Sequence, residues 1–297
     1  MKIQGSANIH LARNKFIPKI LRVVFGALEM RLRTGTNFRD RLRFIHWVDL
    51  KKLPTYTAQR EQELDENIIW QYWAQGIDAA PEIIRICIQS VSKYNGNKTH
   101  IVLSDRDVFN YIELPEHISN KWELINPTKR SNILRLALIA KYGGIWLDAT
   151  CFLSTEIPDQ YFKANFFAFS NSSQDRLLRT WFLAAKKNNP IIILWLRMHY
   201  KFYQYYTKPP CYFFFHYMFE NLVTMEESIR KLWTEIKTDE ADPENNELYA
   251  SILALKPIED TIHIIQRTWI NKLSWRLDPI QVKLMQQIAD QISYNKN

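Results

Sequence analysis

Short apolar runs alternate with amphipathic stretches over residues 65–170. Runs rich in β-branched and aromatic residues predict strands at 67–73, 100–103, 145–148 and 166–170. Apolar positions that recur every three or four residues predict helices between them, at 81–94, 105–111 and 128–141. Strands that alternate with helices along a chain are typical of a mainly parallel sheet flanked by helices. The pattern therefore predicts an α/β fold.

The pattern becomes helical from about residue 175. Apolar spacing there predicts helices at 177–187, 190–206, 212–233, 246–253 and 279–293. An acidic stretch at residues 238–246 predicts a loop between two of them. We therefore expect one α/β domain over residues 61–297, with a helical C-terminal part.

Residues 1–60 precede this domain as a basic amphipathic arm. On a helical wheel, basic side chains from Lys15 to Arg33 share one arc, and apolar side chains from Ile17 to Leu32 lie opposite. A helix of this kind can lie among the headgroups of an anionic bilayer. The alternative is a helix that packs on the domain and leaves its basic face in water. Because the basic cluster continues to Arg43, we expect the arm to contact an anionic membrane surface through residues 15–43.

The net charge of the chain belongs to this arm. The formal charge is +8, and residues 1–45 hold ten basic against two acidic residues, which leaves the remainder neutral. A nucleic-acid-binding domain more often carries its basic surface over the fold itself, and no aromatic platform accompanies the bases of the arm. We therefore expect no nucleic acid partner. The hydrophobic fraction of 46% is sufficient for a real core over most of the chain.

Cysteine usage and hydropathy bear on the compartment. Cys87, Cys151 and Cys211 are widely spaced, so the sequence predicts neither a disulfide framework nor a zinc site. No uncharged run reaches the roughly 18–20 apolar residues of a membrane span. Charges also interrupt the N-terminal apolar stretch, whereas the apolar stretch of a signal peptide is uninterrupted. We expect a cytoplasmic protein, peripheral on the inner face of the cell membrane.

The segment of residues 129–151 carries the candidate chemistry. Ser131 is predicted to cap a helix that carries Asn132 and Arg135 on one face of its first turn. A glycine pair ends that helix, and the following strand brings Asp148 to the C-terminal edge of the sheet, where ligands bind. A helix N-terminus, an arginine and a strand-end carboxylate together suit a metal-bound diphosphate.

This segment resembles the signature of bacterial capsular polysaccharide synthesis proteins and of the related glycosyltransferase family 32. The shared positions are Ser131, Arg135, Tyr142, Gly143, Gly144, Ile145, Trp146, Asp148, Ala149 and Thr150. Further similarity lies at 68–73, 80–84, 212–219 and 268–275. The resemblance thus covers most of residues 65–278, and the arm lies outside it.

The resemblance implies a GT-A-like fold that binds a nucleotide-sugar donor at the C-terminal edge of its strands. It implies that Asp148 and Asn271 hold a divalent metal, Mn²⁺ or Mg²⁺, and that Asn132 and Arg135 hold the hydroxyls of the transferred sugar. Together with Asp148, Asn132 and Arg135 are the expected catalytic group. The other expected donor-binding residues are Trp70, which would stack on the base, Gln71, Gly144, Thr150, His216, Lys272, Ser274 and Trp275.

Two positions depart from the family pattern: Asn132 stands where aspartate is usual, and Asn271 stands where histidine is more common. Thr150 takes the second position of the acidic motif, as in the capsular branch of the family. The protein therefore supplies few carboxylates to a metal, and weak metal dependence is compatible with this set.

The resemblance therefore implies a glycosyltransferase that retains the configuration of the sugar. It would move a sugar, with a UDP-sugar as the expected donor, to a growing capsular polysaccharide or a lipid-linked oligosaccharide precursor. The alternative, motivated by Asn132 and Asn271, is a catalytically silent sugar-nucleotide-binding scaffold subunit of a polysaccharide assembly complex.

Overall fold

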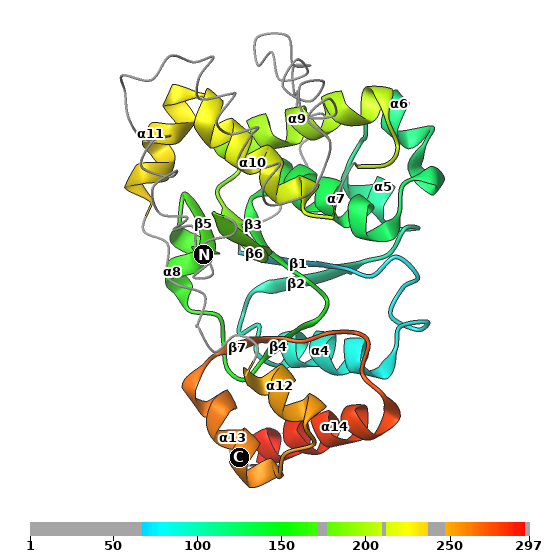
Figure 1. Cartoon of the computed structure of the whole chain (residues 1–297), viewed down its shortest axis with the longest axis vertical. Coiled ribbons are helices and arrows are strands. Elements are labelled where there is room, and N and C mark those ends of the chain that lie inside the picture. Colours follow the sequence, from blue (N-terminus) through cyan, green and yellow to red (C-terminus); the bar gives the residue numbers. More distant parts are fainter. Residues whose placement is uncertain (1–66, 171–176, 210–211, 237–246, 295–297) are drawn as a thin grey trace, which may run out of the picture.

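A computed structural model of the chain describes residues 67–170, 177–209, 212–236 and 247–294. Its centre is a five-stranded sheet of order β2-β1-β3-β6-β5 (Figure 1). The strands are β1 (Ile68–Tyr72), β2 (Thr99–Leu103), β3 (Gly144–Leu147), β5 (Phe166–Ser170) and β6 (Leu178–Ala185). Strand β1 pairs in parallel with β2 and β3, while β6 pairs antiparallel with β3 and β5. All strands of this sheet except β6 thus run in one direction, which confirms the predicted α/β fold with a mainly parallel sheet.

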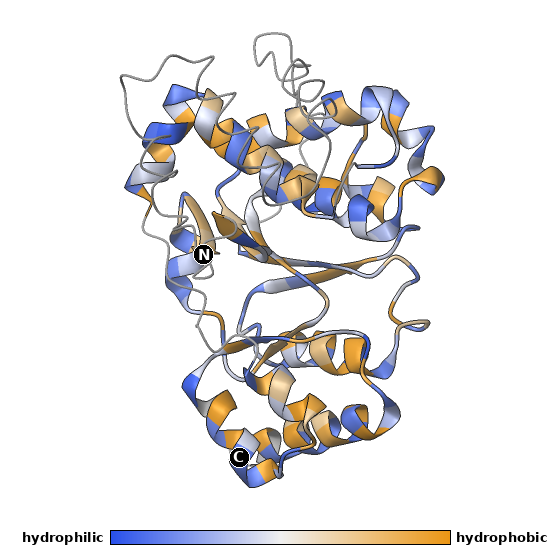
Figure 2. Cartoon of the chain, in the orientation of Figure 1, coloured by the Kyte–Doolittle hydropathy of each residue, from blue (hydrophilic) through white to orange (hydrophobic). Residues whose placement is uncertain are grey.

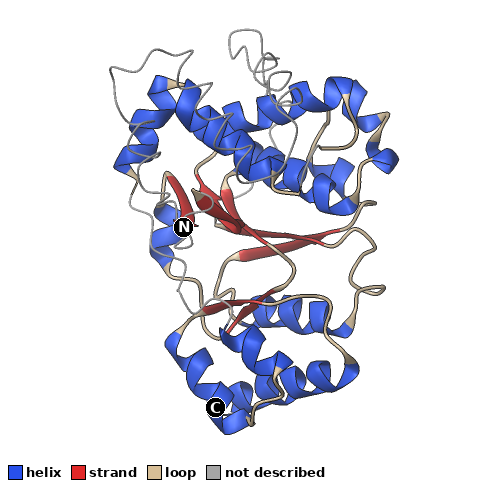
Figure 3. Cartoon of the chain, viewed as in Figure 1, coloured by secondary structure: helices blue, strands red, loops and turns tan. Residues whose placement is uncertain are grey.

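Helices cover both faces of the sheet (Figure 3). One face carries α5 (Val108–Tyr111), α6 (Glu116–Ser119), the 3-10 helix η2 (Trp122–Leu124), α7 (Pro127–Tyr142), α9 (Pro190–Tyr205), α10 (Phe214–Met225) and α11 (Glu227–Glu235). The other face carries α4 (Glu82–Lys93), α8 (Asp159–Lys163), α12 (Glu247–Leu253), α13 (Ile258–Arg267) and α14 (Pro279–Tyr294). The hydrophobic sides of these helices turn inward in Figure 2.

The alternation of side chains along β1 divides the core between these two layers. Ile68 and Trp70 belong to the cluster shared with α7 and α9, and Ile69 belongs to the cluster shared with α4 and α14. This is the period of two that a pleated strand imposes. Because both faces are covered, every residue of β1 is buried.

A second, two-stranded sheet joins the C-terminal part to the centre. Strand β4 (Cys151–Leu153) pairs antiparallel with β7 (Ile270–Lys272). The turn that leads into β4 starts at Asp148, whose carbonyl accepts a hydrogen bond from the Cys151 amide at 2.9 Å. A segment more than a hundred residues downstream is thereby fixed next to the end of β3. Strands of three residues are too short to show a periodic pattern, so the sequence did not predict this sheet.

Two predicted elements differ in the structure, and some helices were not predicted. The segment 177–187, expected to be a helix, contains strand β6. The residues of this strand are buried almost throughout, and the sequence pattern of a buried strand cannot be told from that of a buried helix. The expected helix at 212–233 is two helices, α10 and α11, separated at Glu226, whose backbone is extended. Helices α8 and α13 fall in segments for which the pattern predicted no helix.

Helix α7 also begins earlier than predicted. Its N-cap is Asn126, whose side chain accepts a hydrogen bond from the Thr128 amide, and Pro127 occupies the first helical position. The prediction that Ser131 caps the helix is therefore wrong, because Ser131 lies inside it and donates to the Thr128 carbonyl at 2.8 Å. The predicted end is confirmed at Gly143, which has a φ of 75°.

The basic arm of residues 1–60 and the acidic stretch at 238–246 lie outside the described residues. Among the helices that the structure describes, none has both the length and the apolar composition for a membrane crossing.

Candidate functional site

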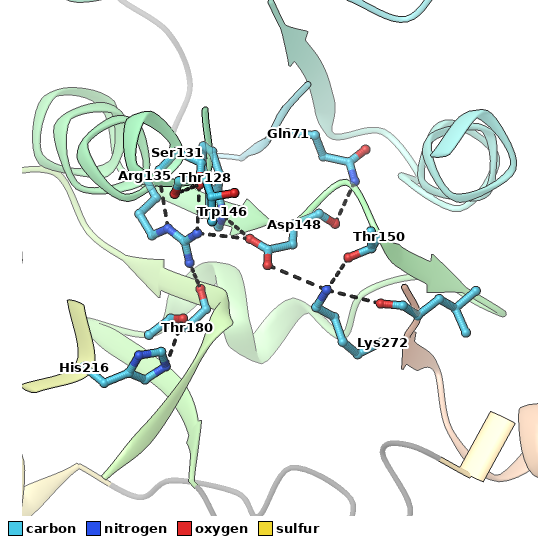
Figure 4. Close-up of polar contacts among 11 residues, drawn as sticks. Gln71, Thr128, Ser131, Arg135, Trp146, Asp148, Thr150, Thr180, His216 and Lys272 are labelled. Atoms are coloured by element: carbon cyan, nitrogen blue, oxygen red, sulfur yellow. Dashed lines mark hydrogen bonds and ion pairs between the residues drawn. The ribbon is translucent and has the colours of Figure 1, made fainter. Parts of the chain in front are cut away.

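Asp148 lies directly after β3, at the C-terminal edge of the parallel strands (Figure 4). Its backbone is held on both sides: its amide donates to the Trp181 carbonyl at 2.9 Å, and its carbonyl accepts from Gln71 Nε2 at 3.3 Å. The indole of Trp146 donates to Asp148 Oδ1 at 2.9 Å. The side chain is 27% exposed, so the carboxylate is fixed and still open to a ligand.

Two cations flank this carboxylate. Arg135 Nη2 lies 3.3 Å from Asp148 Oδ1, and Lys272 Nζ lies 3.8 Å from Oδ2. Burial by itself would raise the pKa of Asp148, but the charges of Arg135 and Lys272 and the Trp146 hydrogen bond outweigh burial and lower that pKa. Asp148 is therefore ionised at neutral pH.

Arg135 reaches Asp148 from the middle of α7 and is only 4% exposed. Its guanidinium lies 5.1 Å from the ring centroids of both Trp146 and Phe215. It also donates to the carbonyls of Ser131 and Thr180. These contacts fix the guanidinium against the carboxylate, so the geometry favours a role in positioning Asp148 over direct contact with a sugar hydroxyl.

Lys272 is the last residue of β7. The register of the small sheet pairs Lys272 with Cys151, just beyond the turn that contains Thr150. The ammonium donates to Thr150 Oγ1 and to the Leu273 carbonyl, the latter at 3.3 Å. The structure thus brings together Asp148, Arg135, Thr150 and Lys272, all of which the family resemblance had placed at the donor.

Trp70 is placed differently from the sequence prediction. It is fully buried, its Nε1 donates to the Gly143 carbonyl at 3.1 Å, and its ring packs against Tyr111 and Tyr142. No face of the ring is open to a nucleotide base, so the stacking prediction is wrong. The role of Trp70 is to tie β1 to the turn before β3, where Gly144 is buried with a φ of 89° that glycine tolerates.

Gln71 positions Asp148 with a partner that the sequence did not single out. Its Oε1 lies 2.8 Å from His100 Nε2 on the neighbouring strand β2, and Ser92 Oγ lies 3.0 Å from His100 Nδ1. Burial lowers the pKa of His100 to about 4, so this histidine is neutral at pH 7. A single histidine inside a strand pattern carries no sequence signal, which is why His100 was not predicted.

The predicted metal site does not fit the residues present. Asn271 precedes Lys272 in β7, so the two side chains point to opposite faces of the strand, and Asn271 is only 4% exposed. Within the described ranges, no three His, Cys, Asp or Glu residues gather in a group that could hold a metal ion. The one carboxylate of the site is shared by two cations. These donors do not form a protein-built site for Mn²⁺ or Mg²⁺.

The remaining predicted residues surround this centre at different depths. His216, on α10, lies with Nε2 3.3 Å from Thr180 Oγ1, the residue whose carbonyl binds Arg135. Asn132 is partly exposed on α7, one turn before Arg135.

Two further predicted residues lie in the loop after β7. Ser274 accepts a hydrogen bond from the Arg276 amide, and Trp275 is 49% exposed. Trp275 is therefore a candidate to fold over a bound donor.

A cavity of about 780 Å³ lies at the other end of β6, between α8, α9 and α11. Its lining includes Lys186, Asn188 and Asn189, and none of the residues around Asp148. The cavity is separate from the charged centre, and we place the candidate site at Asp148.

Comparisons with known proteins found a family model, a curated relative and a solved structure that resemble this chain. A family model described as capsular polysaccharide synthesis protein matches residues 42–292. The O-glycosyltransferase braB of Annulohypoxylon truncatum is 24% identical over 170 residues, which are 50% of this chain and 40% of that protein. The match thus spans less than half the length of this relative. The solved PaToxG Glycosyltransferase aligns with 93% of this chain and 97% of its own, at 14% identity and a TM-score of 0.39.

Proposed function

Because the chain belongs to the capsular polysaccharide synthesis protein family, we propose that it is a glycosyltransferase that uses a nucleoside-diphosphate sugar as donor. The observation that carries this proposal is Asp148, an ionised and accessible carboxylate held at the C-terminal strand edge beside Lys272. Ligands of open α/β sheets bind at this edge. The name of the matched relative, an O-glycosyltransferase, supports the same class.

The residues of the site form two groups: some would contact the donor, and the others hold Asp148 in position. Asp148 offers acceptor oxygens for the hydroxyls of the ribose or the sugar, and the partly exposed Asn132 of α7 offers a neutral amide. Lys272 offers a positive charge for the diphosphate. Arg135, Gln71 and Trp146 keep Asp148 in place, so that little reorganisation is needed when the donor binds.

In the reaction, the bond between the anomeric carbon and the β-phosphate oxygen breaks, and its electron pair stays on the nucleoside diphosphate. A new bond forms between that carbon and the hydroxyl oxygen of the acceptor. In the retaining route that we propose, the leaving phosphate takes the proton of the acceptor hydroxyl on the same face of the sugar. We propose a UDP-sugar as donor and a surface polysaccharide, or its lipid-linked oligosaccharide precursor, as acceptor.

A screen of nucleotide sugars tests this proposal. We expect one donor class, UDP-sugars first, to raise the unfolding temperature of the full chain, because a ligand that binds only the folded state stabilises it. The same donor should then be hydrolysed slowly, with water in place of the acceptor and release of the nucleoside diphosphate. Binding without any turnover would instead favour the scaffold subunit. No shift with any nucleotide sugar would contradict the proposed function.

We also propose that the basic arm holds the enzyme on an anionic membrane, where a lipid-linked acceptor would be found. The family match begins at residue 42, so deletion of residues 1–41 removes most of the arm and spares the matched region. We expect the deletion to abolish cosedimentation with vesicles containing phosphatidylglycerol while donor hydrolysis persists. Neutral phosphatidylcholine vesicles are the control, because the attraction depends on anionic headgroups. Unchanged cosedimentation after the deletion would contradict the membrane role.

A further inference from the structure

The ammonium of Lys272 sits at the centre of the proposed donor site (Figure 4). It donates to Thr150 Oγ1 and to the Leu273 carbonyl, and it faces Asp148 Oδ2. At 3.8 Å the carboxylate attracts the ammonium without accepting a normal hydrogen bond, so the third N–H of the lysine can turn to another anion. The side chain is 25% exposed, which makes this charge reachable from solvent.

A divalent cation at the same place would meet a poor set of ligands. Asp148 Oδ1 is already engaged by Arg135 and Trp146, and Oδ2 faces Lys272. Thr150 offers a hydroxyl, and that hydroxyl is itself bonded to the lysine. Mg²⁺ is usually held by one or two carboxylates together with substrate phosphates and water. The carboxylate of Asp148 is already shared by two cations, so it has little left to offer such an ion.

Charge repulsion adds to this mismatch. An ion bound at Asp148 would lie close to both Arg135 and Lys272, the two cations that flank its carboxylate. Two like charges this close repel each other strongly near a protein surface, where the effective dielectric constant is well below that of water. The lysine and a metal ion are therefore alternatives for one position.

We propose that Lys272 takes the place of a divalent cation in this protein, so that the donor diphosphate binds to its ammonium and donor binding requires no metal ion. This inference rests on the proposed function and specifies how its site holds the donor. Thr150 and Leu273 orient the ammonium, and Asp148 attracts it from 3.8 Å.

The same lysine would assist bond cleavage. As the bond from the anomeric carbon to the β-phosphate oxygen breaks, negative charge grows on the departing diphosphate. A fixed cation stabilises that charge without any proton transfer of its own, which is the preorganised electrostatic contribution found in many active sites. The acceptor proton still leaves with the phosphate, so the reaction balances without a metal.

The first experiment measures metal dependence on the unaltered full chain. Binding of UDP, with GDP and dTDP in parallel, is followed by calorimetry in EDTA and again with Mn²⁺ or Mg²⁺. We expect the dissociation constant of the best nucleotide to change by less than about threefold. Electron paramagnetic resonance of Mn²⁺ alone should show no ion bound at Asp148, which is a readout that does not depend on activity.

The second experiment removes the charge. Lys272→Ala should weaken nucleotide binding in EDTA at least about tenfold, because a charge-assisted hydrogen bond contributes roughly 1.5–3 kcal/mol. Lys272→Gln keeps much of the length and polarity of the side chain and should lose a similar factor. Lys283→Ala, on the exposed surface of α14, is the matched control and should bind like wild type.

The outcomes separate this inference from the function on which it rests. Nucleotide binding that appears only with Mn²⁺ or Mg²⁺ overturns the role of Lys272 and leaves a glycosyltransferase in place. Unchanged binding by a folded Lys272→Ala variant overturns it as well. Failure of all three nucleotides to bind, with or without metal, contradicts the proposed function instead.

Discussion

Replacing Asp148 with asparagine is expected to reduce donor hydrolysis and sugar transfer by about 100- to 1,000-fold, the range typical for loss of one electrostatic group in an active site. The amide keeps the size of the side chain and an oxygen for Trp146 Nε1. It removes the negative charge that attracts Lys272 and Arg135, and its N–H₂ group would repel them. The diphosphate-binding charge and the hydroxyl acceptor would both be disturbed.

The measurement is initial-rate hydrolysis of the donor found in the nucleotide-sugar screen, with the dissociation constant determined separately. Glu123→Gln is the matched control, because Glu123 also pairs with an arginine but is 83% exposed and lies outside the site. Thermal unfolding of both variants shows whether the fold is kept. An Asp148→Asn enzyme that is folded and retains more than a tenth of wild-type turnover would contradict the assignment of Asp148.

The part of this site that the sequence predicts well is local. Arg135, Thr150 and Asp148 lie within one short segment, and a helix, a glycine turn and a strand bring such residues to one edge of a sheet. The strand direction follows from the alternation of strands and helices, so the placement of Asp148 needed no knowledge of distant residues. That placement agrees with the structure.

The less predictable part depends on distant contacts. Lys272 reaches Asp148 only because a strand of three residues pairs with β4, and nothing in so short a run shows its partner. Only the family resemblance predicts that Lys272 lies at the donor. Trp70 illustrates the opposite case: the resemblance assigned it to a base, but burial decides the role of a tryptophan, and burial follows from packing of β1 between two helical layers.

Strand β6 shows a third limit, which concerns the type of element. Its residues pack against both helical layers, so the apolar run has neither the period of two nor a clear helical period. This strand carries Thr180 and Trp181, whose carbonyls bind Arg135 and the amide of Asp148. A helix at this place could not pair with β3 or present these two carbonyls to Arg135 and Asp148. The wrong secondary-structure prediction therefore left both contacts of the site unpredicted.

Replacing Arg135 with methionine is expected to lower the free energy of unfolding at pH 7 by about 3 kcal/mol, the lower end of the cost of breaking a buried ion pair. Methionine can fill the space between Trp146 and Phe215, so the main loss is electrostatic. Asp148 would lose its nearer cation, and the carbonyls of Ser131 and Thr180 would lose a donor. Urea unfolding measures the change, with Arg267→Met as the control, because the Arg267–Glu247 pair is exposed and should contribute less than about 1 kcal/mol.

The pH dependence of that loss identifies its cause. The pKa of Asp148 is lowered in the folded protein, so the stabilisation is present above the ordinary aspartate pKa of about 3.9 and is lost as the pH falls through the lowered value. The difference in unfolding free energy between wild type and Arg135→Met should therefore shrink when unfolding is measured at progressively lower pH, as Asp148 becomes protonated in both. A difference that stays constant from pH 7 to pH 3 would show that Arg135 stabilises the fold through its packing between two rings, and the positioning role of its charge would then be wrong.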